Sequence, residues 1–205
     1  MKHFYAIILF SFFATSSFAG DGFYNNLQSA LANLDDVVVL DLSGQGLVQI
    51  HGSIPMMKNL EKLDVSNNSI TVIPNSLHLL ANLADLNVSE NQIKEVPVNL
   101  YLLKKLTHLN LSNNNLTAVP KNLQLLKTLQ NLLLSNNKIP MLPANIYLCN
   151  GLKKIDVSDN PITSLPSNIY LLKTLEQIDA RNTKITSLPY MVKTSNINIW
   201  LGSKE

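Results

Sequence analysis

The hydrophobic positions of the chain recur with a period of 23 residues. Each unit follows the pattern L-x-L-S-x-N-x-L-x-x-L-P-x-x-L-x-L-L-x-x-L-x-x. The first residues of the units are Leu40, Leu63, Leu86, Leu109, Leu132, Ile155 and Ile178. We number the positions of a unit from 1 to 23 and call the residues at one position of all units a column. Seven units in phase, without an insertion, predict a repeat protein whose units stack on one another.

Each unit predicts one strand and one helical return. Apolar residues at positions 1 and 3 have the period of a strand with one buried face. Apolar residues at positions 15, 18 and 21 have helical spacing, and proline at position 12 suits a first helical turn. Asparagine at position 6 is expected to hydrogen-bond to the backbone of neighbouring turns. We therefore expect parallel strands joined by helical or 3₁₀ returns.

The two ends depart from the repeat. Residues 23–34 carry an apolar stripe at helical spacing and predict an amphipathic capping helix, followed by a first strand over 37–42. The predicted organisation is a cap and first strand over 20–39, repeats over 40–200 and a tail over 201–205. A last strand is expected over 199–201. Either this strand closes the stack, or its free edge can pair with another chain.

These units resemble the leucine-rich-repeat family, in its 23-residue class with the second half L-P-x-x-I-x-x-L. The similarity covers residues 40 to about 200, and the N-terminal helix resembles the one in exported bacterial members. The resemblance implies an α/β solenoid. This would be a right-handed horseshoe with short parallel strands on the concave face and helical or 3₁₀ returns on the convex face.

The first nineteen residues have the pattern of a secretory signal peptide. Lys2 and His3 precede the apolar run Phe4–Thr15, and Ser17-Phe18-Ala19 places small residues before a cleavage site. We therefore expect an exported protein, either secreted, periplasmic or on the cell surface. The alternative is an uncleaved anchor. No second long apolar run occurs, so no membrane span is expected in the mature chain.

Composition narrows the function further. The chain holds 37 Leu and 26 Asn, a net charge of +2 and a single Arg, which argues against a nucleic-acid partner. Its one cysteine, Cys149, stands at core position 18. His51, His78 and His108 fall in different columns, so we expect no catalytic site, cofactor or metal. A calcium site at Asp156 and Asp179 is the remaining minor possibility.

The strand columns that point away from the core predict a binding surface on the concave side. Columns 23 and 2 are polar and mildly acidic, with Leu133 exposed near the middle. Solenoids bind partners on such faces, although these columns could also be merely solvated. The predicted protein-binding residues are Asp64, Asp85, Asn87, His108, Asn110, Asn131, Leu133, Lys154, Asp156, Gln177, Asp179 and Arg181.

Column 17 carries more leucine than the repeat requires. Tyrosines stand beside it in column 16, at Tyr101, Tyr147 and Tyr170. These leucines could pack between neighbouring turns. Alternatively, they form a convex stripe that meets a second protein or another copy of the chain. The members of column 17 are Met56, Leu79, Leu102, Leu125, Leu148 and Leu171.

Together these patterns predict an exported, non-catalytic module that binds a protein on its concave face. By resemblance to exported bacterial members, the partner would be a surface protein of a host or neighbouring cell. The alternatives are a periplasmic or envelope scaffold and a regulatory subunit of an enzyme partner.

Overall fold

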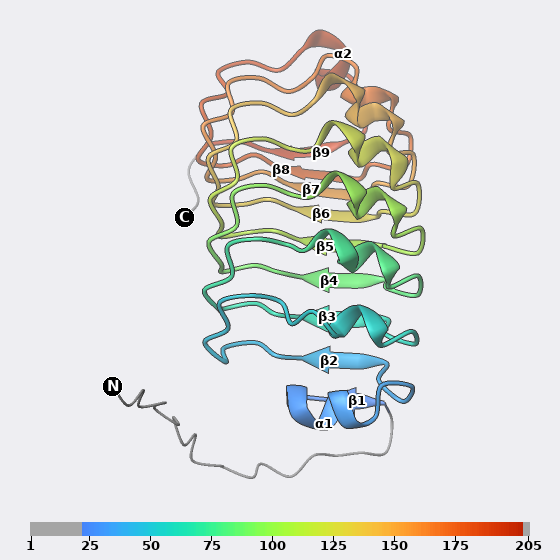
Figure 1. Cartoon of the computed structure of the whole chain (residues 1–205). Coiled ribbons are helices and arrows are strands. Elements are labelled where there is room, and N and C mark those ends of the chain that lie inside the picture. The colour runs from blue at the N-terminus through green and yellow to red at the C-terminus, as the bar shows by residue number, and fades with distance from the viewer. Residues whose placement is uncertain (1–21, 203–205) are drawn as a thin grey trace, which may run out of the picture.

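The computed structural model describes residues 22–202, and these residues form one continuous parallel sheet (Figure 1). The predicted signal peptide, residues 1–19, lies outside the described residues, as do residues 203–205 of the tail. The strands pair in chain order. They are β1 (Phe23–Tyr24), β2 (Val39–Asp41), β3 (Lys62–Asp64), β4 (Asp85–Asn87), β5 (His108–Asn110), β6 (Asn131–Leu133), β7 (Lys154–Asp156), β8 (Gln177–Asp179) and β9 (Asn198–Trp200).

The strand register follows the sequence period from β2 to β8. Leu40 lies opposite Leu63, and each later strand pairs with the residue 23 positions further on, as far as Ile155 opposite Ile178. The central residue of each strand is buried, and its two neighbours face away from the core. The columns of the sequence are therefore physical rows that run across the sheet.

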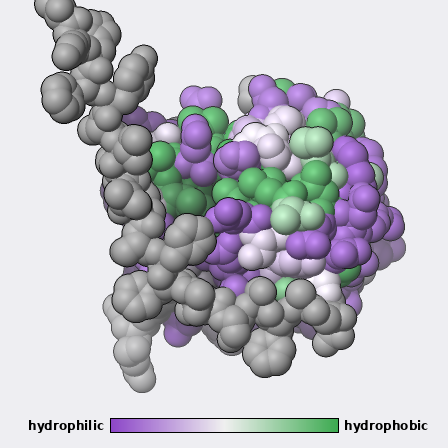
Figure 2. Space-filling model, turned by 60° about the horizontal axis from the view of Figure 1, so that its bottom comes forward, coloured by the Kyte–Doolittle hydropathy of each residue, from purple (hydrophilic) through white to green (hydrophobic). Residues whose placement is uncertain are grey.

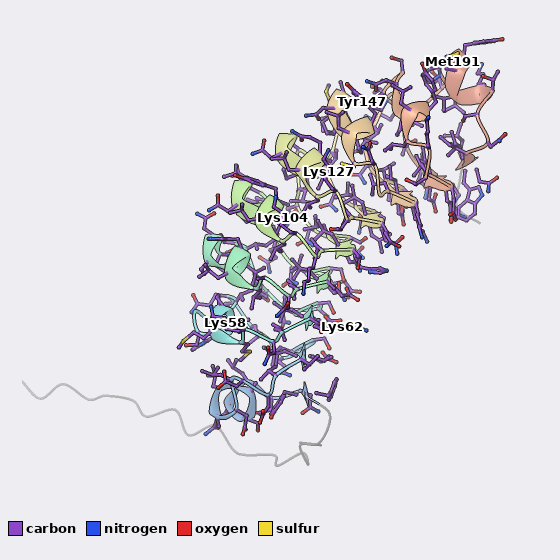
Figure 3. All side chains as sticks on the ribbon, turned by 90° about the vertical axis from the view of Figure 1, so that its right-hand side faces the viewer. Lys58, Lys62, Lys104, Lys127, Tyr147 and Met191 are labelled. Atoms are coloured by element: carbon purple, nitrogen blue, oxygen red, sulfur yellow. The ribbon has the colours of Figure 1, made fainter. Side chains whose placement is uncertain are left out.

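The returns are short 3₁₀ turns. An extended proline precedes most of them; Pro74, for example, has φ −68° and ψ 142°. Figure 3 shows the turns on the outer, convex side of the curved stack and the strands on its inner side. This arrangement confirms the predicted open leucine-rich-repeat solenoid. The turns are η1 (Ile54–Met56), η2 (Asn75–Leu79), η3 (Val98–Leu102), η4 (Lys121–Leu125), η5 (Ala144–Leu148) and η6 (Ile169–Leu171).

A ladder of buried asparagines at position 6 links consecutive turns, as the sequence predicts. The side chain of Asn114 accepts a hydrogen bond from Ile93 N (2.9 Å) and donates to Val88 O (3.0 Å) and Leu111 O (3.2 Å). Asn68, Asn91, Asn137 and Asn160 make the equivalent bonds. Each amide therefore satisfies backbone groups that would otherwise be buried without partners.

The N-terminal cap differs from the predicted helix over 23–34. The helix α1 covers only Leu27–Ala32, and its N-cap Asn26 accepts a hydrogen bond from Ser29 N (3.0 Å). Phe23 and Tyr24 instead form β1, which pairs with β2. Tyr24 is buried, and the backbone of β1 pairs with β2, so the sheet gains one strand at this end. Figure 2 brings this end forward and shows hydrophobic residues among the hydrophilic ones.

The last unit is two residues shorter than the others. Ile178 pairs with Ile199, 21 residues on, and Asp179 pairs with Trp200. Trp200 therefore belongs to the row of column 2, whereas the sequence period places it in column 23. The shortening lies after Pro189, where the short helix α2 (Tyr190–Lys193) replaces a 3₁₀ turn. In the part of the chain that the structure describes, no helix is long and apolar enough to cross a membrane.

Candidate functional site

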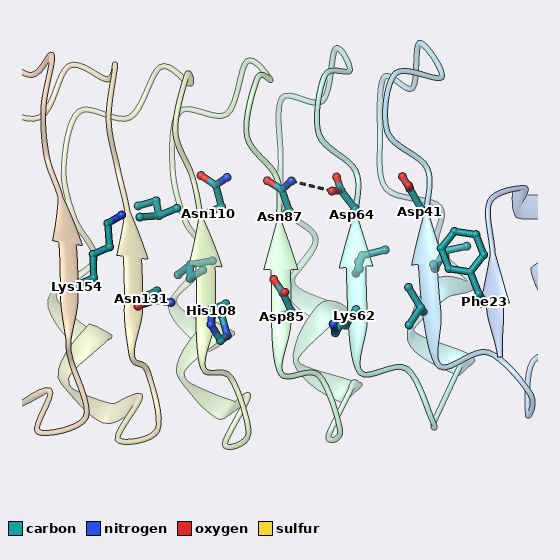
Figure 4. Close-up of a pocket in the computed structure, with 15 residues that line it drawn as sticks. Phe23, Asp41, Lys62, Asp64, Asp85, Asn87, His108, Asn110, Asn131 and Lys154 are labelled. Atoms are coloured by element: carbon teal, nitrogen blue, oxygen red, sulfur yellow. Dashed lines mark hydrogen bonds between the residues drawn. The ribbon is translucent and has the colours of Figure 1, made fainter. Parts of the chain in front are cut away.

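The concave side of the sheet holds a hollow of about 410 Å³ over strands β1 to β7. Two rows of side chains, columns 23 and 2, project into it from neighbouring strands (Figure 4). The hollow is lined by Phe23, Val39, Leu40, Asp41, Lys62, Leu63, Asp64, Asp85, Asn87, His108, Leu109, Asn110, Asn131, Leu133 and Lys154. It is therefore a shallow trough that mixes both charges with apolar contacts.

Column 23 supplies side chains that the strands position but the fold does not need. Lys62 and Lys154 flank Asp85, His108 and Asn131 along the row (Figure 4). The contact of His108 is local, since its Nδ1 lies 2.8 Å from Oγ1 of the adjacent Thr107. A partner's polar atoms can therefore bind these side chains by displacing only surface water.

Column 2 has a structural role that the sequence pattern did not reveal. The carboxylate of Asp64 accepts a hydrogen bond from Ser66 N (2.8 Å), and the amide oxygen of Asn110 accepts one from Ser112 N (3.1 Å). Asp156 accepts from both the backbone N (3.0 Å) and Oγ (2.7 Å) of Ser158. Such contacts from a side chain to the backbone two residues on stabilise the turn after each strand.

Leu133 is the exception in column 2. In the other repeats this position carries an Asp or Asn that can cap the turn, whereas a leucine has no acceptor for Ser135 N. Leu133 is half-buried and lines the hollow on the same face as His108 and Asn131. The repeat's own turn-capping chemistry therefore does not account for this leucine.

Eight of the twelve predicted residues line the hollow: Asp64, Asp85, Asn87, His108, Asn110, Asn131, Leu133 and Lys154. The other four do not line it and lie further along the sheet: Asp156, Gln177, Asp179 and Arg181. The prediction omitted the buried central residues Leu40, Leu63 and Leu109, and also Phe23, Val39, Asp41 and Lys62. Val39, Asp41 and Lys62 extend the two rows toward the N-terminus and could have been found from the period. Phe23 could not, because it lies outside the repeats.

A separate cluster stands at the C-terminal end of the concave face. Arg181 donates from Nε to Asp179 Oδ1 (3.0 Å) and from Nη2 to Asp179 Oδ2 (2.6 Å), and its guanidinium lies 5.2 Å from the centre of the Trp200 ring. These hydrogen bonds raise the pKa of Arg181 above its ordinary value. Asp179 is only 4 % exposed, and both carboxylate oxygens face Arg181. This pairing argues against the calcium site considered at Asp156 and Asp179.

Within residues 22–202, no group of side chains is arranged as a catalytic site. Cys149 is fully buried, and burial raises the pKa of its thiol to about 11, so it stays protonated near neutral pH. No group of three or more His, Cys, Asp or Glu among the described residues could hold a metal ion. The arrangement offers polar and apolar contacts to a partner molecule and no activated nucleophile.

The fold is that of a leucine-rich-repeat solenoid. Leucine-rich-repeat family models match residues 35–93 and 105–126. No curated protein matches the sequence. Among solved structures, 428 chains match, so the fold alone does not select a partner.

Three of these structures illustrate the range. A leucine-rich-repeat protein of Leptospira interrogans is 32 % identical, with a TM-score of 0.74, over 87 % of this chain and 53 % of its own. An internalin from Listeria monocytogenes shares the fold at 19 % identity and a TM-score of 0.72, over 88 % and 51 %. The plant peptide hormone receptor RGFR1, in complex with RGF2, is 25 % identical with a TM-score of 0.67, over 82 % and 29 %. The chain thus spans about half the length of the first two structures and less of the third.

Proposed function

We propose that this chain is an exported, non-catalytic module that binds a protein partner in the concave hollow between β1 and β7. The observation that carries the proposal is Leu133, an apolar side chain in a row of turn-capping polar residues, within a hollow of about 410 Å³. A leucine held half-exposed among polar groups on a rigid sheet is a suitable anchor for a partner's apolar side chain.

Charge along the hollow favours a partner with groups of both signs. Lys62 on β3 and Lys154 on β7 stand at either end of column 23 with Asp85 on β4 between them, whereas Asp41 on β2 and Asp64 on β3 stand in column 2. A segment that runs across the strands, with acidic groups near Lys62 or Lys154 and a basic group near Asp64 or Asp85, would match these charges. Phe23, 40 % exposed, adds a second apolar contact at the N-terminal end.

The resemblance to an internalin and to a peptide-bound receptor supports a protein or peptide partner. Export rests on the signal-peptide pattern of residues 1–19. We propose a surface protein of a host or neighbouring cell as the partner. Fractionation of the producing cell tests this part: release into the medium supports it, whereas retention in the envelope would favour a scaffold or a regulatory subunit.

The binding site is tested by affinity capture on immobilised residues 20–205. A variant with Asn131→Ala and Lys154→Ala removes two column 23 side chains that contribute nothing to the turns. We expect one specific protein that the wild type retains and this variant loses. A matched control, Thr163→Ala with Lys184→Ala, changes exposed residues away from the hollow and should retain it. Equal capture by all three proteins would place the site elsewhere.

Self-association through the β9 edge is a separate part of the proposal. Asn198 N and Trp200 O bond to the neighbouring strand, so the backbone groups of Ile199 face the other way by alternation. An antiparallel pair of β9 strands would give a two-fold dimer. Sedimentation of the wild type and of Ile199→Pro tests it, since a monomeric wild type excludes this dimer.

A further inference from the structure

The acidic residues of the repeats are absent from one side of the solenoid, whereas lysines occur on every side. Positions 12 to 20, which form the convex turns and the flank that leads back to the next strand, contain seven lysines and no Asp or Glu in all seven repeats. The carboxylates stand instead on the strands, in the loops that follow them, and at position 22. Nothing in the hydrophobic repeat requires this segregation, because positions 16, 17, 19 and 20 are open to solvent in most units.

The same flank exposes the leucines of column 17. Their exposed fractions run from 37 % for Leu102 and Leu148 to 48 % for Leu79, and Met56 in the same column is 55 % exposed. Every member of column 17 is therefore exposed at the surface and does not pack entirely between neighbouring turns. The stripe crosses six consecutive turns, and the tyrosines of column 16 lie next to it. We call the central part of this surface the basic flank, defined by Tyr101, Leu102, Lys104, Lys105, Leu125, Lys127, Tyr147 and Leu148.

The lysines of the basic flank lie directly among its apolar side chains. Lys104 Nζ is 3.0 Å from Tyr101 O and 5.2 Å from the centre of the Tyr101 ring. Lys127 Nζ donates to Leu148 O in the next repeat (2.8 Å). Lys105 Nζ donates to Asn82 Oδ1 (2.7 Å). The ion pair found within residues 22–202 joins Arg181 to Asp179, so no described carboxylate neutralises these ammonium groups.

The shape of the basic flank argues against an inserted protein anchor. Figure 3 faces this flank and shows Lys58, Lys104, Lys127 and Tyr147 along one row. The crevice beside Tyr101, lined also by Leu100 and Pro120, measures only about 10 Å³. Interface hot spots occupy well-packed pockets and favour Arg over Lys.

We infer that the basic flank docks the protein on an anionic lipid bilayer. Leucine and tyrosine side chains reach the acyl boundary and the headgroup level, while flexible lysines attract acidic headgroups as point charges. Exposed apolar residues and unneutralised lysines on one surface are the two requirements of such binding. Docking by this flank leaves the concave hollow open, so the inference does not depend on the proposed protein partner.

Vesicle flotation tests the inference with residues 20–205, because the apolar run Phe4–Thr15 would itself partition into lipid. The probes are vesicles of phosphatidylcholine alone and of phosphatidylcholine mixed with phosphatidylglycerol. We expect binding to the anionic vesicles only, weakened by salt. Lys104→Gln with Lys127→Gln should weaken it at least tenfold, since each lysine near an anionic surface contributes about 1 kcal/mol. Lys62→Gln with Lys154→Gln, an equal charge change on the concave face, should leave it unchanged.

The apolar contribution is tested separately by Leu125→Ser with Leu148→Ser. Its matched control is Val72→Ser with Met141→Ser, which are 65 % and 66 % exposed on the other side of the repeat. We expect at least a tenfold loss for the first pair and none for the second, with circular dichroism showing that both pairs stay folded.

Three outcomes would overturn the inference. One is failure to bind anionic vesicles, and another is unchanged vesicle binding by both flank variants. The third is binding that needs the lysines but not the leucines, together with retention on heparin, which would indicate a sulfated polysaccharide. Concentration-dependent dimerisation that the leucine variant abolishes, without vesicle binding, would assign the stripe to a second copy of the chain.

Discussion

At the scale of single residues, much of the asparagine content reflects backbone geometry. Column 5 adopts positive φ in each described repeat, between 52° and 56° at its non-glycine members and 65° at Gly44. Asn, Asp and Gly tolerate this left-handed conformation better than other residues. Glu90, with φ 54°, is the member that does not suit it.

Glu90→Asn is therefore expected to stabilise the fold by about 0.5–1 kcal/mol, because asparagine adopts the left-handed region at lower cost. Chemical denaturation with and without the substitution measures the change. The reciprocal variant Asn67→Glu, at the same position of the preceding repeat, should destabilise by a similar amount. If Glu90→Asn lowered the unfolding free energy, this explanation of column 5 would fail.

Cys149 gives a second prediction at this scale. Its thiol is fully buried and its pKa is raised to about 11. Below pH 9 the reactive thiolate is therefore a minor species, and a reagent cannot reach it in the folded protein. The native protein should react with a thiol reagent only as fast as it unfolds. Leu125→Cys in a Cys149→Ala background supplies an exposed thiol that should react at once. Rapid labelling of native wild-type Cys149 would contradict the buried assignment.

At the scale of elements, the asparagine ladder holds one turn to the next. Asn114→Ala would leave Ile93 N and the carbonyls of Val88 and Leu111 without their partner. We expect a loss of about 2–3 kcal/mol, as for buried backbone groups that lose hydrogen bonds. Asn150→Ala, an exposed asparagine, should stay within about 0.5 kcal/mol of the wild type. Equal stability of the two variants in denaturant titrations would contradict the ladder.

The period predicted the repeated elements and missed the ends. From β2 to β8, every strand position follows from the spacing of residues such as Leu40 and Ile178, because each unit packs only on its neighbours. Phe23 and Trp200 lie where a neighbour is absent on one side among the described residues. The register of Phe23 is set by local packing against β2, and that of Trp200 by a last unit that is two residues shorter. A 23-residue period shows neither.

The candidate binding surface was predictable only in part for a related reason. The period correctly grouped columns 23 and 2, so Asp85, Asn87 and Asn131 came together as expected. It did not separate side chains that cap a turn from those that are free, because that distinction depends on contacts such as Asp64 with Ser66 N. Because Asn110 and Asp156 also cap turns, a substitution at Leu133 reports on binding more directly than a substitution at either of them.

At the scale of the whole molecule, the solenoid presents two chemically different surfaces. The concave hollow mixes carboxylates, lysines and apolar contacts, whereas the basic flank combines leucine, tyrosine and lysine without acidic residues. We propose that the first recognises a protein and the second a lipid surface. Because the two surfaces share no residues, variants of one should leave binding by the other unchanged.

The central claim, protein recognition in the concave hollow, is tested most directly by Leu133→Asn. Asparagine is the residue that the repeat itself uses at this position, as at Asn110, so the substitution can restore the turn hydrogen bond to Ser135 N. The account predicts unchanged or higher stability together with at least a tenfold weaker Kd for the captured partner. Val72→Asn, the same kind of change outside the hollow, should leave the Kd unchanged. A wild-type Kd for a stable Leu133→Asn protein would contradict the account.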